Sequence, residues 1–264
     1  MKSWLISIWL YRNFIYSSVK RYLVAMFARS KLGGLWIVIN PLVQVLIYAL
    51  ILSNILSAKL PGIDNKYAYA IYLMAGFLAW NLFSDLINRG TNMFVSNAGI
   101  LQKMSFPKIT LPCISVGSSV VNNFLLFATM IVIFLVLGHG FTLQVLWLIP
   151  LTTLVTLLGV SIGLIVDVLN VFMRDIGNFM AIILQVWMWF TPIVYPESII
   201  PEEYRGLLMM NPMYPIVDAY HNVLLYGTAP SLDVLLYIGV WSLFLLGFGL
   251  FLFKKAKAEM VDVL

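Results

Sequence analysis

The sequence predicts an all-α polytopic membrane protein with six transmembrane helices. Of the 264 residues, 62% are hydrophobic and 10% are charged, whereas soluble domains carry about 25% charged residues. Long uncharged intervals recur along the chain, and a helix needs about 20 apolar residues to cross a bilayer. We expect one transmembrane domain over residues 1–264, with spans at roughly 35–57, 67–88, 111–137, 143–167, 177–195 and 234–253.

The basic residues predict the orientation of these spans. Thirteen of the sixteen Lys and Arg residues lie in the first, third, fifth and last gaps around the uncharged intervals. Because Lys and Arg concentrate in cytoplasmic loops, both termini are expected in the cytoplasm of a multi-pass inner-membrane protein. The net charge of +5 then reflects topology and contact with anionic membrane lipids, and it does not indicate nucleic acid.

The region before the first span, residues 1–34, is expected to contain an amphipathic helix at the cytoplasmic interface. Trp4, Ile8 and Tyr11 recur at helical spacing, and Arg12 lies off that stripe. Aromatic side chains would then face the membrane interior while Arg12 reaches the lipid phosphates. A frayed leader segment is the alternative interpretation.

The predicted cytoplasmic loop at residues 89–108 mixes apolar and small residues with polar ones. This composition fits a short helix parallel to the membrane, and it fits an ordinary connecting loop equally well. As a helix, the segment would expose to a partner the side chains of Asn92, Ser96, Asn97 and Gln102.

The external connections carry turn and helix signals. Gly138-His139-Gly140 interrupts an uncharged interval that is long enough for two spans, and predicts a hairpin between them. In the segment 197–233, a proline followed by two glutamates is typical of a helix start. An Asn-Pro pair breaks the chain, and Tyr214–Tyr226 resumes a helical pattern that Gly227 can end. Two short re-entrant helices forming an external gate are therefore predicted, with Pro201, Glu202, Glu203, Asn211 and Pro212.

Motifs for chemistry are absent from the sequence. It has no Gly-x-x-x-x-Gly-Lys phosphate loop and no metal-ligand spacing, so we expect neither an enzyme nor a cofactor on this chain. His139 is expected to be a hairpin-turn residue. Asp85 and Asp167 sit at cytoplasmic span ends, where helix-end or partner contacts are more consistent than proton relays. If the protein drives transport, the energy is expected to come from another polypeptide.

A series of motifs in order resembles the membrane subunits of polysaccharide-exporting ABC transporters, which include the O-antigen, capsule and teichoic-acid exporters. The resemblance covers nearly the whole chain. The matching residues are Arg29–Trp36, Asn40-Pro41-Leu42, Gly76–Asn81, Asn97, Ile100-Leu101, Lys103, Phe106-Pro107, Arg174-Asp175-Ile176, Thr191–Tyr195 and Asn211-Pro212-Met213.

The resemblance implies a homodimer that works with two copies of a separate ATPase subunit, which binds ATP and Mg. The substrate would be a lipid-linked polysaccharide, O-antigen above all, and the external helices would lie over the exit of its path. The loop at 89–108 would hold a coupling helix. The residues assigned to contact with the ATPase are Asn92, Ser96, Asn97, Ala98, Ile100, Gln102, Arg174 and Asp175.

Aromatic residues are candidates for the wall of the path, because the C–H faces of sugars stack on rings. Trp and Tyr are also enriched at membrane interfaces, so a purely interfacial role stays open. An ABC exporter of drugs or lipids, or of teichoic acid in a Gram-positive cell, is the alternative function. The candidate rings are Tyr72, Phe77, Trp80, Trp187, Trp189, Phe190 and Tyr195.

Overall fold

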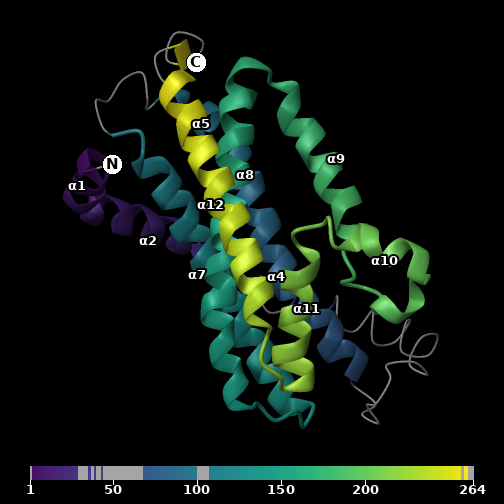
Figure 1. Ribbon diagram of the computed structural model, residues 1–264. Helices are drawn as coiled ribbons and strands as arrows, with labels where there is room; N and C mark the ends of the chain where they lie inside the picture. Colours follow the sequence, from purple (N-terminus) through teal and green to yellow (C-terminus); the bar gives the residue numbers. More distant parts are fainter. Residues whose placement is uncertain are drawn as a thin grey trace.

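The computed structural model describes residues 2–28, 35–36, 39, 43, 68–99, 107–256 and 259–260. Within these ranges the regular structure is helical (Figure 1), which confirms the predicted all-α class. The predicted first span and the motifs between Arg29 and Leu42 lie almost entirely outside the described residues. Four helices are long and apolar enough to cross a membrane: α4 (Ala68–Thr91), α7 (Thr110–Val136), α8 (Leu148–Phe172) with the 3-10 turn Leu143–Trp147 before it, and α12 (Leu232–Ala256).

Helix α4 forms the centre of the bundle. Within its most apolar window 83% of the residues are buried, against 17% for α12, which lies at the periphery. Glycines bring α4 and α8 into close contact: a Cβ atom on Gly90 would lie 2.8 Å from the Cα atom of Gly163. Small residues at helix contacts allow this approach in membrane proteins. The contact makes α4 and α8 a firmly packed pair that runs the length of the bundle.

The predicted hairpin between the third and fourth spans is confirmed. Helix α7 ends at Val136, and Gly138 takes the left-handed conformation with φ 75°. The Nε2 atom of His139 lies 2.7 Å from the carbonyl oxygen of Leu224. His139 is thus a turn residue, and its ring attaches the hairpin to the segment after α11.

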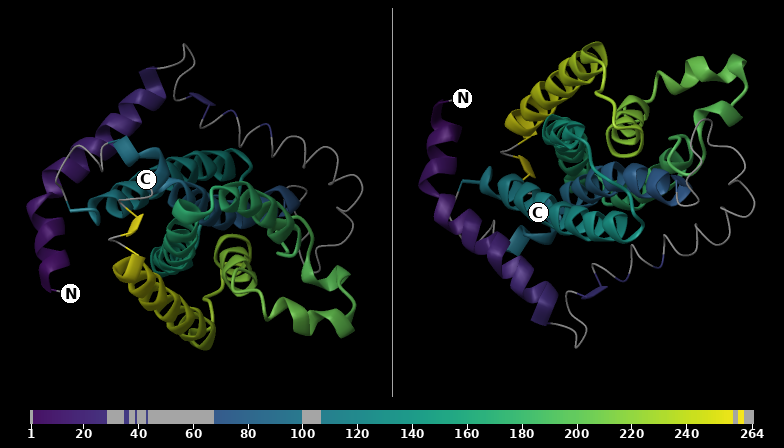
Figure 2. Two further views of the ribbon diagram at one scale, coloured as in Figure 1. Left: turned by 90° about the horizontal axis from the view of Figure 1, so that it is seen from above. Right: turned by 90° about the horizontal axis from the view of Figure 1, so that it is seen from below.

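The N-terminal helices α1 (Lys2–Leu10) and α2 (Arg12–Ala28) lie across the long helices rather than along them (Figures 1 and 2). Helix α2 approaches α7 at Gly117, where a Cβ atom would be 2.9 Å from Val19. The Arg12 guanidinium lies 4.5 Å from the centre of the Trp9 ring. The predicted helix is therefore present, and its location at a membrane interface stays a prediction.

The predicted fifth span corresponds to α9 (Asp175–Trp189), which has 15 residues. At 1.5 Å per residue it extends about 22 Å, less than the roughly 30 Å of a hydrocarbon core. A non-helical turn, residues 190–196, follows it. Six complete spans therefore stay a prediction.

Two short helices precede the last long helix, as predicted. Helix α10 (Glu202–Leu208) begins immediately after Pro201, with two glutamates in its first turn. Helix α11 (Tyr214–His221) continues into a π-helical turn, Asn222–Tyr226. Gly227, at φ 65°, ends this turn. In Figure 1 α11 lies along the half of the bundle away from α5 (Met93–Ser96), and α10 projects to the side.

Candidate functional site

Polar side chains gather at both ends of the α4–α8 pair. We call the contacts of Asp167 and Asn170 with the neighbouring backbone the α5 junction. The contacts of Tyr69, Tyr72 and Asn211 with the turn at 190–196 are called the α11 junction. Both hold irregular backbone, whose polar groups must be satisfied where water is excluded.

At the α5 junction, the carboxylate of Asp167 accepts the backbone N–H of Phe94, with N–O distances of 3.2 and 3.3 Å. Asp167 has no exposed surface. A carboxylate at the first turn of α5 satisfies an N–H group that lacks a partner within the helix. Asp167 therefore makes the helix-end contact expected from its place at the end of a span.

Asn170 extends the α5 junction to the start of α9. Its Nδ2 atom donates to the carbonyl oxygen of Thr91 at 2.8 Å, and its Oδ1 atom accepts the N–H of Gly177 at 2.9 Å. The side chain of Asn92 is also within 3.4 Å of Asn170. One residue of α8 thus links the two loops that are predicted to face the cytoplasm.

The residues predicted to contact an ATPase surround this junction. Asn92 and Ser96 are exposed, Asn97 and Ala98 are half-buried, and Arg174 and Asp175 are exposed in the turn between α8 and α9. Ile100 and Gln102 lie outside the described residues. Helix α5 itself has only four residues and is anchored by buried Phe94, whose ring stacks on Phe253 of α12 at 5.4 Å.

A second anchor lies nearby on α4. Arg89 forms an ion pair with Asp85 at 2.8 Å and donates to the hydroxyl of Tyr22 at 2.5 Å. The guanidinium also lies 4.5 Å from the centre of the Tyr22 ring. Asp85 therefore makes a helix-end contact, and Arg89 attaches α2 to the same end of the bundle as α5.

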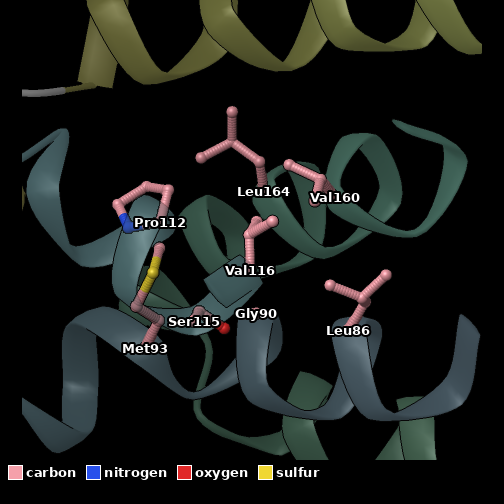
Figure 3. A pocket seen from close by; sticks show the side chains of 8 residues that line it. All are labelled: Leu86, Gly90, Met93, Pro112, Ser115, Val116, Val160 and Leu164. Atoms are coloured by element: carbon pink, nitrogen blue, oxygen red, sulfur yellow. The ribbon is translucent and has the colours of Figure 1, made fainter. Parts of the chain in front are cut away.

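A small apolar cavity lies beneath α5 (Figure 3). It has a volume of about 20 Å³, about the space of one water molecule. Helices α4, α5, α7 and α8 all contribute side chains to its wall. The labelled residues are Leu86, Gly90, Met93, Pro112, Ser115, Val116, Val160 and Leu164.

At the α11 junction, Asn211 joins three segments. Its Oδ1 atom accepts hydrogen bonds from Nε1 of Trp187 at 2.8 Å and from the N–H of Met213 at 3.0 Å. Its Nδ2 atom donates to Oγ1 of Thr191 at 2.9 Å and to the carbonyl oxygen of Phe190 at 3.2 Å. The side chain therefore holds the end of α9 against the start of α11.

Two tyrosines of α4 hold the turn at 190–196 from the other side. The hydroxyl of Tyr72 lies 3.1 Å from the carbonyl oxygens of Pro192 and Tyr195, and that of Tyr69 donates to the carbonyl of Val194. The ring of Tyr72 stacks on His221 with a centroid distance of 3.7 Å. The turn thus lies between α4 and α11.

The structure separates the predicted path aromatics into two groups. Tyr72, Phe77 and Trp80 are buried in the core around α4. Trp189 and Phe190 are 57% and 66% exposed at the end of α9. Between these groups lie two half-buried rings: Trp187, which packs edge-on against Phe83, and Tyr195, which donates to the carbonyl of Trp189.

The predicted gate residues also fall into an exposed group and a half-buried group. Pro201, Glu202 and Glu203 are exposed at the start of α10, away from the junction, while Asn211 and Pro212 are half-buried within it. Sequence reasoning missed Glu197 and Asp218, which line a cavity of about 190 Å³ beside Tyr72. The acidic character of the 197–233 segment was the available signal, but the sequence alone does not indicate that α11 turns Asp218 toward Glu197.

Several long apolar helices, with short helices at both ends of the bundle, define a multi-pass membrane protein. Residues 13–225 match the ABC-2 type transporter membrane family, and the chain belongs to it. It is 28% identical to the O-antigen export system permease protein RfbA of Myxococcus xanthus, over 96% of this chain and 95% of that protein. It is 30% identical to a protein of the same description from Klebsiella pneumoniae (89% and 88%), and 23% identical to the polysialic acid transport protein KpsM of Escherichia coli (89% and 90%).

Proposed function

We propose that this chain is the membrane subunit of an ATP-driven exporter that moves a lipid-linked polysaccharide, such as O-antigen, across the inner membrane. The observation that carries the proposal is similarity over almost the full length to relatives described as O-antigen export permeases and a polysialic acid transport protein. This similarity extends over both junctions, so it indicates the function more specifically than membership of a broad transporter family does.

The energy source in this proposal is a separate ATPase. The sequence lacks a phosphate loop, so ATP and Mg would bind to two copies of a partner subunit. The α5 junction is the proposed contact, through the exposed side chains of Asn92, Ser96, Arg174 and Asp175. Ala98, half-buried beside them, would pack in the same contact.

Transmission of motion would follow the hydrogen bonds of the α5 junction. A displacement of α5 would move α8 through the hydrogen bond of Asp167. The same displacement would move α9 through the hydrogen bond of Asn170. Because α4 and α8 pack closely at Gly90 and Gly163, they would move as one unit toward the α11 junction. The apolar cavity beneath α5 (Figure 3) holds only about 20 Å³, so little of this movement would be lost before it reaches α8.

Two copies of the chain would enclose the path. Six spans per copy, with both termini in the cytoplasm, follow from the predicted topology, with α9 and its following turn as the fifth crossing. The exposed aromatic rings of Trp189 and Phe190 would then face the path or the partner copy, with α10 and α11 over the exit.

The proposed function can be tested in a strain from which the gene for this chain has been deleted. We expect polysaccharide to accumulate inside the cell and to disappear from the surface, and the strain lacking the ATPase should show the same phenotype. Wild-type surface polysaccharide with altered sensitivity to a hydrophobic drug would instead support a drug or lipid exporter. Loss of wall-linked phosphate polymer in a Gram-positive cell would support teichoic-acid export.

The topology can be tested separately, because Cys113 is the only cysteine. In a Cys113→Ser background, a membrane-impermeant thiol reagent applied to spheroplasts should label cysteine introduced at Glu203 but not at Asn97. Labelling of Asn97 from outside would reverse the proposed orientation.

A further inference from the structure

A cavity of about 190 Å³ lies between the start of α4, the turn after α9 and α11. Its base is formed by Tyr72, Tyr214 and His221, which are 5%, 6% and 3% exposed. Asp218 and Tyr226 lie at its rim, where they are partly exposed and partly covered by neighbouring residues. The cavity is therefore closed at its aromatic base and open on the side of its rim.

Two carboxylates in this cavity keep hydrogen-bonding capacity. Glu197 accepts from the hydroxyl of Tyr214 at 2.7 Å, and Asp218 accepts from Nδ2 of Asn222 at 2.9 Å. Within the described part of the chain, the second oxygen of each carboxylate has no hydrogen-bond partner. Ionised carboxylates only accept hydrogen bonds, so a ligand here must donate them.

The charges of the described residues that line the cavity disfavour anionic ligands. Among the described residues that line it, none is Lys or Arg. Among the described residues, Arg205 acts on Tyr214 by its charge, and it already contacts Glu202 at 3.8 Å and the carbonyl of Ile200 at 3.2 Å. Burial and the charge of Glu197 raise the pKa of Asp218 above its ordinary value. A phosphate or carboxylate group would be repelled.

The aromatic rings complement a ligand with both hydroxyl groups and C–H faces. The rings of Tyr72, Tyr214, Tyr226 and His221 all contribute to the wall. At about 190 Å³ the cavity is smaller than the roughly 300–1,000 Å³ of sites for drug-sized ligands. It therefore fits one ring rather than an oligosaccharide.

We propose that this cavity binds a single neutral, hydroxyl-rich sugar residue through hydrogen bonds to Glu197 and Asp218. The proposal rests on the proposed function and narrows its substrate: the sugar is a neutral unit of the exported polysaccharide. The site lies within one copy of the chain, beside the turn that Tyr69 and Tyr72 hold, and so it does not depend on how two copies pair.

The test is saturation-transfer NMR on the full-length protein in lipid nanodiscs, with a panel of neutral methyl glycosides as probes. We expect at least one glycoside to bind, and binding to fall at least tenfold in Glu197→Gln and in Asp218→Asn. These amides preserve side-chain shape while removing charge. The matched controls are Glu203→Gln and Asp233→Asn, whose carboxylates are exposed and lie outside the cavity.

Three results would overturn the proposal: no neutral glycoside binds, binding is unchanged in both amide variants, or tetramethylammonium binds at this site in place of glycosides. A methyl glycoside of sialic acid serves as the anionic probe and should not bind. Thermal unfolding of each variant separates loss of binding from loss of fold. Because purified protein is used, a negative result removes this site alone, whereas the deletion phenotype tests the exporter function independently.

Discussion

At both the α5 and the α11 junction, polar side chains bind irregular backbone through hydrogen bonds. The two junctions differ in the volume of the cavity beside them. At the α5 junction, Asp167 and Asn170 of α8 bind backbone groups directly, and the adjacent cavity is about 20 Å³ and apolar. At the α11 junction, Tyr72 and Asn211 bind backbone groups beside a polar cavity of about 190 Å³. A nearly filled contact suits transmission of force, and a hollow polar one suits binding of a ligand.

The largest effect is expected from a charge placed on the proposed ATPase contact. Ala98→Glu would put an unpaired carboxylate into a packed interface, at a cost of roughly 2–5 kcal/mol of binding free energy. We expect the ATPase subunit to dissociate in co-purification and export to stop.

Gly140→Glu is the matched control for this variant. It adds the same charge to an exposed hairpin at the opposite end of the bundle, where the added Cβ atom meets no described atom within 4 Å. Normal export in both variants would place the ATPase contact elsewhere on the chain.

Removal of the Asp167 carboxylate should weaken the attachment of α5 to α8. Its effect on export should be smaller than that of Ala98→Glu. Asp167→Ala leaves the N–H of Phe94 without its partner, which costs about 1–3 kcal/mol. We expect faster amide hydrogen exchange at Phe94 and less export per ATP hydrolysed, while the ATPase stays bound. Asp167→Asn retains an acceptor oxygen and should recover part of both properties. Unchanged exchange at Phe94 in the alanine variant would refute this role.

The two junctions were predictable from the sequence to different degrees. The Pro-Glu-Glu start of α10 and the glycine at the end of the π-helical turn have local causes, and both were predicted correctly. Phe94, in contrast, is buried because Phe253 stacks on it from a helix far along the chain. The burial of Tyr72 likewise depends on His221. Contacts between distant segments decide both, and periodicity within one segment cannot reveal them.

Asn211 provides the corresponding test of the α11 junction. Asn211→Ala leaves the N–H of Trp187 and the start of α11 without their acceptor, at a cost of about 1–3 kcal/mol. The expected result is slower export with normal ATPase binding, together with a shift in tryptophan fluorescence. Asn178→Ala, at an exposed position on α9, is the control and should behave as wild type. Loss of ATPase binding in Asn211→Ala would mean that the two junctions are not separable.

The smallest expected effect is the pH dependence of stability that arises from Asp218 in the cavity of the α11 junction. Burial and the nearby charge of Glu197 raise the pKa of Asp218 in the folded protein above its ordinary value near 3.8. The folded state therefore favours the protonated acid. The contribution of Asp218 to stability is fully present below that ordinary pKa and is lost as the pH rises through the higher folded value. Asp218→Asn cannot ionise and should show a flatter dependence of melting temperature on pH from about 4 upward, whereas the exposed control Asp233→Asn should follow wild type. An unchanged slope in Asp218→Asn relative to wild type would show that Asp218 ionises without penalty and that the cavity is as well solvated as the open surface.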